Sequence, residues 1–224
     1  MPHLFTDRRG GVSLGVYESL NLALHVGDDP HAVRSNRKTL ANRIGTEAEK
    51  VFFMNQVHGN AVEVITNAQH ESPTCDALVT TTPGITLAVL TADCIPLLLS
   101  SHSVVAAVHV GRRGLVNGVA RKTVQIMREL GADTITGKLG ASICGTCYEV
   151  DQSTFDEVVE LHPSAHSQSS KGTPSLDLAK ALVDDLSSVS VQCDVDTRCT
   201  NEDANLFSYR KSHRTGRQAG LIRL

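Results

Sequence analysis

The sequence predicts a single-domain α/β fold (mixed α+β), with a mixed β-sheet core and helices packed outside it. Short apolar runs rich in Val and Leu are bounded by Gly, Ser and Asn, as buried strands usually are. Other segments space their apolar residues at helical intervals. The two kinds of segment are interspersed without a regular strand–helix–strand rhythm, which favours a mixed sheet over a parallel one.

The N-terminal half combines short strands with one well-marked helix. Residues 4–27 alternate apolar pieces with Gly and Asn, which indicates strands and turns. A carboxylate followed by Pro30 is a typical helix start, and the helix should run to about Ile44 and end at Gly45. Three more strands are expected at Val51–Met54, Ala61–Ile65 and Cys75–Thr80, with a turn at Thr82–Gly84.

The centre of the chain holds two strongly apolar runs, residues 89–99 and 104–110, which predict two buried neighbouring strands. Asp93 and Cys94 fall in the middle of the first run, where a charged residue is costly unless it is paired or bound. The remaining elements are expected as a helix from Val116 to Leu130, a strand at 138–144, helices at 152–161 and 176–189, a loop at 162–172 and a final strand ending near Leu224.

Length and composition describe an ordinary globular protein. The 224 residues can bury roughly 70% of their unfolded surface in one domain. A net charge of −3 and the absence of Trp give no sign of a nucleic-acid surface. No apolar run approaches the length of a membrane span, and the N-terminus lacks a signal-peptide core, so a cytoplasmic protein without membrane contact is expected.

One thiol and two imidazoles are the side chains best suited to catalysis or metal binding. Cys94 and His109 lie in the two apolar runs, and His58 precedes a Gly at the end of another. Three protein ligands with an open fourth position are the catalytic form of zinc coordination. A thiol beside a His is equally the nucleophile–base pair of a cysteine hydrolase, with Asp93 or Asp76 to orient the base. The sequence leaves both chemistries open, beside a purely structural role for each residue.

Cationic residues flanked by Gly suggest an anion site. Arg113 follows the His109 strand between Gly111 and Gly114, in a turn whose N–H groups would suit an anion. Arg210 and Arg217 could supply further contacts to phosphate.

The pair Cys144 and Cys147 forms a C-x-x-C motif, which could be half of a zinc knuckle or a redox pair. No helical run follows directly, and a four-cysteine site with Cys193 and Cys199 would have poor spacing. These mismatches favour free thiols.

Seven motifs occur in order along nearly the whole chain: N-Q-V-H-G at 55–59, C-D-A-L-V-T at 75–80, T-A-D-C-I-P-L-L-L at 91–99, A-V-H-V-G-R-R-G at 107–114, C-Y-E-V at 147–150, L-D-L-A at 176–179 and C-T…F-S-Y-R…T-G-R-Q-A-G-L-I at 199–222. Together they resemble the laccase-domain, or polyphenol-oxidase-like, proteins, whose members are now described as purine nucleoside phosphorylases.

The resemblance implies one domain over residues 1–224, with a mixed sheet sandwiched by helices, and a metal, usually zinc, held by His58, Cys94 and His109. It implies phosphorolysis of adenosine, inosine or guanosine, so purine nucleosides and phosphate are the expected partners. Phosphorolysis of S-methyl-5′-thioadenosine and deamination of adenosine are also attributed to the family. Older descriptions call members copper-dependent polyphenol oxidases, which makes copper a second candidate metal. A bacterial role in peptidoglycan editing has been proposed as well.

One position departs from the family pattern. The family has G-W-R-G after the second ligand His, whereas this chain has Arg112 in place of the Trp. If that Trp stacks on the base, substrate preference will differ here.

The resulting hypothesis is a zinc-dependent nucleoside phosphorylase with Cys94, His58, His109 and Asp93 as catalytic residues and Arg113 as first choice for the anion. The alternatives are a cysteine-type hydrolase of peptidoglycan precursors and a non-enzymatic protein with a closed zinc site. In the closed site Cys75 or Asp76 would be the nearest candidate for a fourth ligand. The oligomeric state stays open.

Overall fold

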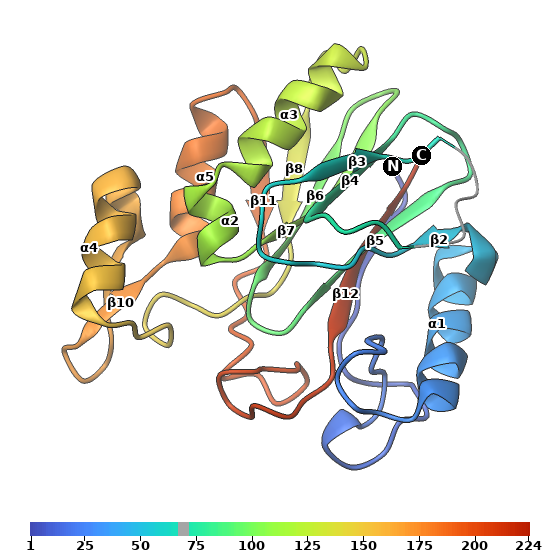
Figure 1. Ribbon diagram of the computed structural model, residues 1–224, viewed down its shortest axis with the longest axis horizontal. Coiled ribbons are helices and arrows are strands. Elements are labelled where there is room, and N and C mark those ends of the chain that lie inside the picture. Colours follow the sequence, from blue (N-terminus) through green and yellow to red (C-terminus); the bar gives the residue numbers. More distant parts are fainter. Residues whose placement is uncertain (67–71) are drawn as a thin grey trace.

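The protein folds into two β-sheets packed face to face, with helices covering the outer face of each sheet (Figure 1). The coordinates are a computed structural model that describes residues 1–66 and 72–224. Among the helices of these residues, none is both long and apolar enough to cross a membrane. The predicted mixed α/β architecture is confirmed.

The larger sheet has six strands in the order β11-β8-β6-β7-β4-β3. Its outer pairs β3/β4 and β11/β8 are parallel, whereas its inner pairs are antiparallel, so the sheet is mixed as predicted. The strands are β3 (Val62–Val64), β4 (Ala77–Thr80), β6 (Ile95–Ser100), β7 (Val105–Val110), β8 (Thr136–Leu139) and β11 (Gln192–Val195).

The smaller sheet has four strands in the order β1-β12-β5-β2, so the last strand of the chain lies between the first strand and β5. These strands are β1 (His3–Phe5), β2 (Val51–Phe52), β5 (Thr86–Thr91) and β12 (Gln218–Arg223). A separate two-stranded hairpin pairs β9 (His166–Gln168) with β10 (Pro174–Leu176).

Five α-helices of the described residues flank the sheets, and two of them, the helices at 30–44 and 152–161, match their sequence-based bounds closely. The Asp29 carboxylate caps the first helix by accepting a hydrogen bond from the His31 N–H at 2.9 Å, and Gly45 ends it in the left-handed conformation. The helices are α1 (Pro30–Ile44), α2 (Arg112–Val116), α3 (Val119–Glu129), α4 (Gln152–Leu161) and α5 (Leu178–Ser187). Short 3₁₀ helices lie at Gly15–Tyr17, Ala48–Lys50 and Pro163–Ala165.

Alternation along the strands builds three apolar layers. On β5, Leu87 and Val89 belong to the layer between the two sheets, and Ala88 and Leu90 belong to the layer under α1. The third layer lies between the six-stranded sheet and α2–α5. The side chain of His109 follows those of Val105 and Ala107 on the inter-sheet face of β7, and thus lies where that layer opens to the surface.

The predicted strand at 89–99 is wrong in one respect that matters for function. The run is two strands: β5 belongs to the smaller sheet and β6 to the larger one. The chain turns between them at Asp93, whose φ of 102° is left-handed. Asp93 and Cys94 therefore lie in a connection between sheets rather than inside a strand. The two apolar runs still supply neighbours, because β6 pairs with β7.

Other elements also differ from expectation. The predicted helix from Val116 begins earlier and is broken at Gly118, where φ is +70° and α2 gives way to α3. The Gly-flanked turn at 111–114 is the start of α2. The strand expected at 138–144 is displaced to Thr136–Leu139, and the loop expected at 162–172 contains a 3₁₀ helix and the β9 strand.

Candidate active site

His58, Cys94 and His109 meet at one end of the sheets, each supplied by a different part of the chain. Their ligand atoms all lie within 4.8 Å of one another, and Cys94 Sγ is 3.8 Å from His58 Nε2. The two imidazole rings meet edge to face, with centroids 4.7 Å apart. His58 comes from the loop after β2, Cys94 from the turn between β5 and β6, and His109 from the end of β7. The trio that the sequence singles out is thus a spatial cluster.

Asp76 holds two of these three residues in place. Its fully buried carboxylate lies 2.8 Å from His109 Nδ1 and accepts hydrogen bonds from the backbone N–H groups of Val57, His58 and Gly59. The carboxylate fixes the ring so that His109 Nε2 is left for the cluster, an arrangement common around metal-binding histidines. Of the two aspartates considered from sequence as the orienting residue, Asp76 therefore has this contact.

The charges of the cluster favour a thiolate. Burial alone would raise the pKa of Cys94, but hydrogen bonds and positive charge from His109 and His58 outweigh burial and lower that pKa to about 6. Burial would likewise lower the pKa of His109, but Asp76 and Cys94 raise it to about 9. Burial also disfavours the Asp76 carboxylate, yet its hydrogen bonds to His109 and the backbone lower its pKa. A thiolate near neutral pH is the form that binds metals or attacks carbonyl carbon.

The donor set fits a divalent metal of the zinc class. One thiolate sulfur and two imidazole nitrogens suit borderline-soft Zn²⁺, and copper accepts the same set. The backbone leaves room beside them: a Cβ added at Gly111 would lie 3.0 Å from both Cys94 Sγ and His58 Cδ2. Among the described residues no fourth His, Cys, Asp or Glu joins this group, so a metal held here would have three protein ligands, the number typical of catalytic zinc sites.

Neither sequence candidate for a fourth ligand is available to the group. The Cys75 thiol packs against Pro73 O at 3.8 Å, and burial raises its pKa to about 12. The Asp76 carboxylate is occupied by His109 and the three backbone N–H groups.

The cluster opens into a cavity of about 950 Å³. This volume is at the upper end of the range for small-molecule sites. The loop after β2, the β5–β6 turn and the segment before β12 all contribute to its lining. The lining residues are His25, Met54, Asn55, Gln56, His58, Leu90, Thr91, Ala92, Asp93, Cys94, His109, Ile143, Tyr148, Tyr209, Arg210, His213 and Arg217.

Two of the three arginines predicted to bind an anion line this cavity. Arg217 is half-buried; its guanidinium donates to the carbonyls of Thr215 and Gly216 and lies 5.7 Å from the centroid of the Tyr209 ring. Burial lowers the pKa of Arg217, and the charges of Asp93 and Cys94 partly offset that effect. Arg210 donates to the Glu149 carbonyl at 2.9 Å and lies over Tyr148.

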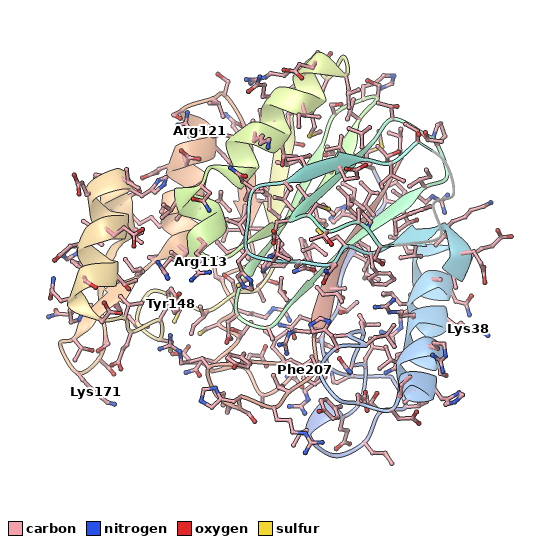
Figure 2. The ribbon with its side chains drawn as sticks, in the orientation of Figure 1. Lys38, Arg113, Arg121, Tyr148, Lys171 and Phe207 are labelled. Atoms are coloured by element: carbon pink, nitrogen blue, oxygen red, sulfur yellow. The ribbon has the colours of Figure 1, made fainter. Side chains whose placement is uncertain are left out.

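Arg113 lies elsewhere. Its side chain is exposed on α2, where Figure 2 labels it, and it is not among the residues that line the cavity. Glycine spacing indicated an N–H-rich turn, but α2 begins there and takes the side chain to the surface. Arg112, which replaces the family's Trp, faces Glu157 of α4 at 3.5 Å.

Asp93 connects the β5–β6 turn to two segments near the C-terminus. Its carboxylate accepts hydrogen bonds from the Thr200 hydroxyl and the Arg210 N–H, both at 2.6 Å. Among the described hydrogen bonds Asp93 makes none with His58 or His109, so its contacts are those of a residue that positions the Arg210 segment. Sequence spacing could not reveal a partner 117 residues away.

Comparison with known proteins finds similar chains along the whole length. Residues 2–224 match the family described as "Multi-copper polyphenol oxidoreductase laccase". A Corynebacterium glutamicum protein named purine nucleoside phosphorylase is 47% identical over 98% of this chain and 92% of its own. One of the same name from Streptomyces coelicolor is 44% identical over 97% and 93%.

Solved structures agree with the fold. The Neisseria meningitidis protein NMB0706 superposes with a TM-score of 0.89 at 37% identity, covering 99% of this chain and 93% of its own. YlmD from Geobacillus stearothermophilus superposes with a TM-score of 0.85 at 31% identity, covering 99% and 92%.

Proposed function

Because this chain belongs to the family described as multi-copper polyphenol oxidoreductase laccases, and relatives at 44–47% identity are named purine nucleoside phosphorylases, we propose that it is a zinc-dependent purine nucleoside phosphorylase. Its substrates are adenosine, inosine and guanosine with inorganic phosphate, and S-methyl-5′-thioadenosine is a further substrate of the same class. Deamination of adenosine is proposed as a second activity of the same cavity.

The observation that carries this proposal is that one cavity contains both a set of metal donors and a pair of arginines. The donors His58, Cys94 and His109 and the cations Arg210 and Arg217 line the same cavity. Phosphorolysis needs an anion beside the sugar, and a cavity of about 950 Å³ has room for a nucleoside and phosphate together. Two tyrosines, Tyr148 and Tyr209, supply flat walls for a purine.

In the reaction a phosphate oxygen attacks the anomeric carbon of the ribose, and the bond from that carbon to the purine nitrogen breaks. Arg217 and Arg210 would hold the phosphate and orient it for attack. Asp93 fixes the Arg210 segment, and Asp76 fixes His109 and the loop of His58. The departing purine takes up a proton, for which His25 and His213 are the other imidazoles in the cavity. A zinc ion bound to the trio would supply a Lewis acid at the reacting centre.

The first test is phosphate dependence. Purified protein incubated with inosine or adenosine should release hypoxanthine or adenine and form ribose 1-phosphate only when phosphate is present, as followed by chromatography. Inosine formed from adenosine in the same samples would establish the deaminase activity. Base release that ignores phosphate would identify a nucleoside hydrolase instead, and no release with any of the purine nucleosides would rule out the phosphorylase.

The KM for phosphate tests whether Arg217 or Arg113 binds the anion. Arg217→Gln should raise the KM for phosphate about 10- to 100-fold, because a hydrogen bond to a charged group contributes roughly 1.5–3 kcal/mol. Arg113→Gln is the matched control, since Arg113 is the predicted anion ligand that lies outside the cavity walls. Steady-state kinetics with phosphate as the varied substrate measure both. A raised phosphate KM for Arg113→Gln with a normal value for Arg217→Gln would reverse the assignment.

A specific observation also supports the alternative of a cysteine-type hydrolase of peptidoglycan precursors. Cys94, His109 and Asp76 have the order of a nucleophile, a base and a carboxylate that orients the base. If Cys94 acts as the nucleophile, metal-free protein should cleave such precursors, and a thiol alkylator should stop it. Copper-dependent polyphenol oxidation is less well supported, because reduction of O₂ at several copper ions needs more His-rich sites than the one that the described residues form.

A further inference from the structure

A second cluster of metal-binding side chains lies behind the cavity wall, outside the site described above. The sulfurs of Cys144, Cys147 and Cys199 and a carboxylate oxygen of Glu202 all lie within 4.8 Å of one another. Cys147 Sγ is 3.3 Å from Glu202 Oε1. The four residues come from two loops, one between β8 and α4 and the other between β11 and β12. Cys193, the partner considered from sequence, lies on β11 outside the cluster.

Each loop presents its two donors from a tight turn. The N–H groups of Cys147 and Tyr148 both donate to the Cys144 carbonyl at 3.1 Å, which closes the first turn. The N–H groups of Glu202 and Asp203 donate to the Cys199 carbonyl at 3.2 and 2.9 Å, which closes the second. The motifs are thus C-x-x-C and C-x-x-E, two halves with the same spacing and the same backbone turn. The interpretation of these cysteines as unrelated free thiols does not account for this pairing.

Two of the three sulfurs have polar neighbours. The Cys144 N–H donates to Cys199 Sγ at 3.3 Å, and the Thr146 hydroxyl lies 3.2 Å from Cys144 Sγ. Hydrogen bonds of this kind, from the backbone and from neighbouring side chains, support thiolate ligands in metal sites. Glu202 takes part in none of the ion pairs found among the described residues, and its carboxylate contacts the cluster through Cys147 Sγ.

The donors match a closed zinc site. With Zn–S bonds of about 2.3 Å, a tetrahedral ion would hold its sulfurs roughly 3.8 Å apart, which is within the observed spread. We propose that Cys144, Cys147, Cys199 and Glu202 bind a structural zinc ion. Its four protein ligands leave no open position, in contrast to the three donors that face the cavity. Glu202 is exposed, which gives the ion a route from solvent.

This ion would clamp together two segments that form the cavity wall. Ile143 and Tyr148, which flank the first turn, both line the cavity, and the Ile143 N–H donates to the Asp93 carbonyl at 2.9 Å. Thr200, which follows Cys199, donates its hydroxyl to the Asp93 carboxylate. The structural zinc would therefore hold together the two loops that contact Asp93. The proposal concerns a separate site and does not depend on which reaction the cavity catalyses.

Metal counting tests the site directly. Elemental analysis of purified protein should find two zinc ions per chain in the wild type, one in Cys147→Ser, one in Cys94→Ala and none in the double variant. Cys193→Ser is the matched control and should retain both ions. Loss of the structural ion should also lower the Tm by about 5–10 °C, whether or not substrate is turned over.

Cobalt gives a second readout. Cys94→Ala reconstituted with Co²⁺ should show strong near-ultraviolet absorption from thiolate ligands, and this band should disappear when Cys147→Ser is added. If Cys147→Ser fails to fold, Glu202→Gln serves instead and should weaken metal binding about tenfold or more in a chelator competition. A wild-type count of one ion that survives in Cys147→Ser would overturn the proposal. So would a disulfide among the three cysteines, detected as two missing thiols in denatured protein.

Discussion

Replacing Cys94 with alanine should remove the metal from the cavity and, with it, the phosphorolysis of nucleosides. The variant loses the only sulfur of the trio and leaves two imidazoles, which bind zinc far more weakly than three donors do. Because a Lewis acid contributes several kcal/mol to the stabilisation of a transition state, kcat/KM should fall about 1000-fold or more. Initial rates with inosine and phosphate, together with the zinc content of the same sample, measure the effect.

Cys193→Ser controls for loss of a cysteine as such, and should keep wild-type rates. Cys94→Asp separates the two chemical roles of this residue, because a carboxylate binds zinc but does not replace a thiolate nucleophile. Partial activity of Cys94→Asp in step with its zinc content supports the metal role. Wild-type activity in Cys94→Ala would remove the trio from the mechanism altogether.

Asp76→Asn is expected to have the largest effect of any conservative change around the cavity. The amide keeps the shape of the carboxylate, but it replaces one acceptor oxygen with a donor that faces backbone N–H groups. A buried donor left unpaired and a lost charge should lower the free energy of unfolding by about 3–5 kcal/mol. The pairing with His109 is lost as well, so zinc affinity should fall about 10- to 100-fold.

Denaturant unfolding and a zinc-competition titration measure the two effects of Asp76→Asn separately. Asp93→Asn is the informative comparison, since its carboxylate contacts Thr200 and Arg210 and not the imidazoles. It should leave zinc affinity near the wild-type value while it alters phosphate kinetics through the Arg210 segment. Equal losses of zinc affinity in the two variants would contradict the division of roles between the two aspartates.

Local signals in the sequence were enough for the elements whose ends are marked by particular residues. The Asp29 cap and Gly45 define α1 because both act on their own helix within one turn. The trio was identified because a thiol and two imidazoles stand out in apolar surroundings and lie in motifs shared with a known family. Helices α1 and α4 and the mixed sheet follow from the spacing of apolar residues, which needs no knowledge of distant partners.

Features that depend on contacts between residues distant in the sequence could not be predicted from it. The apolar run at 89–99 gives no sign of a change of sheet, because the turn is made by the non-glycine residue Asp93 at positive φ. The position of Arg113 depends on where α2 begins, which glycine spacing did not reveal. The role of Glu202 depends on a loop that approaches Cys147 from 55 residues away, and an exposed Glu carries no local signal.

The place of β12 has a consequence for the order in which the protein can be made. This strand pairs with β1 on one side and β5 on the other, so the smaller sheet lacks its middle until residues 218–223 have been synthesised. The segment just before it, with Tyr209, Arg210 and Arg217, supplies a wall of the cavity. The first strand must therefore wait for nearly the whole chain before it finds its partner. The larger sheet does not include β12, and all of its strands are present once Val195 has been made.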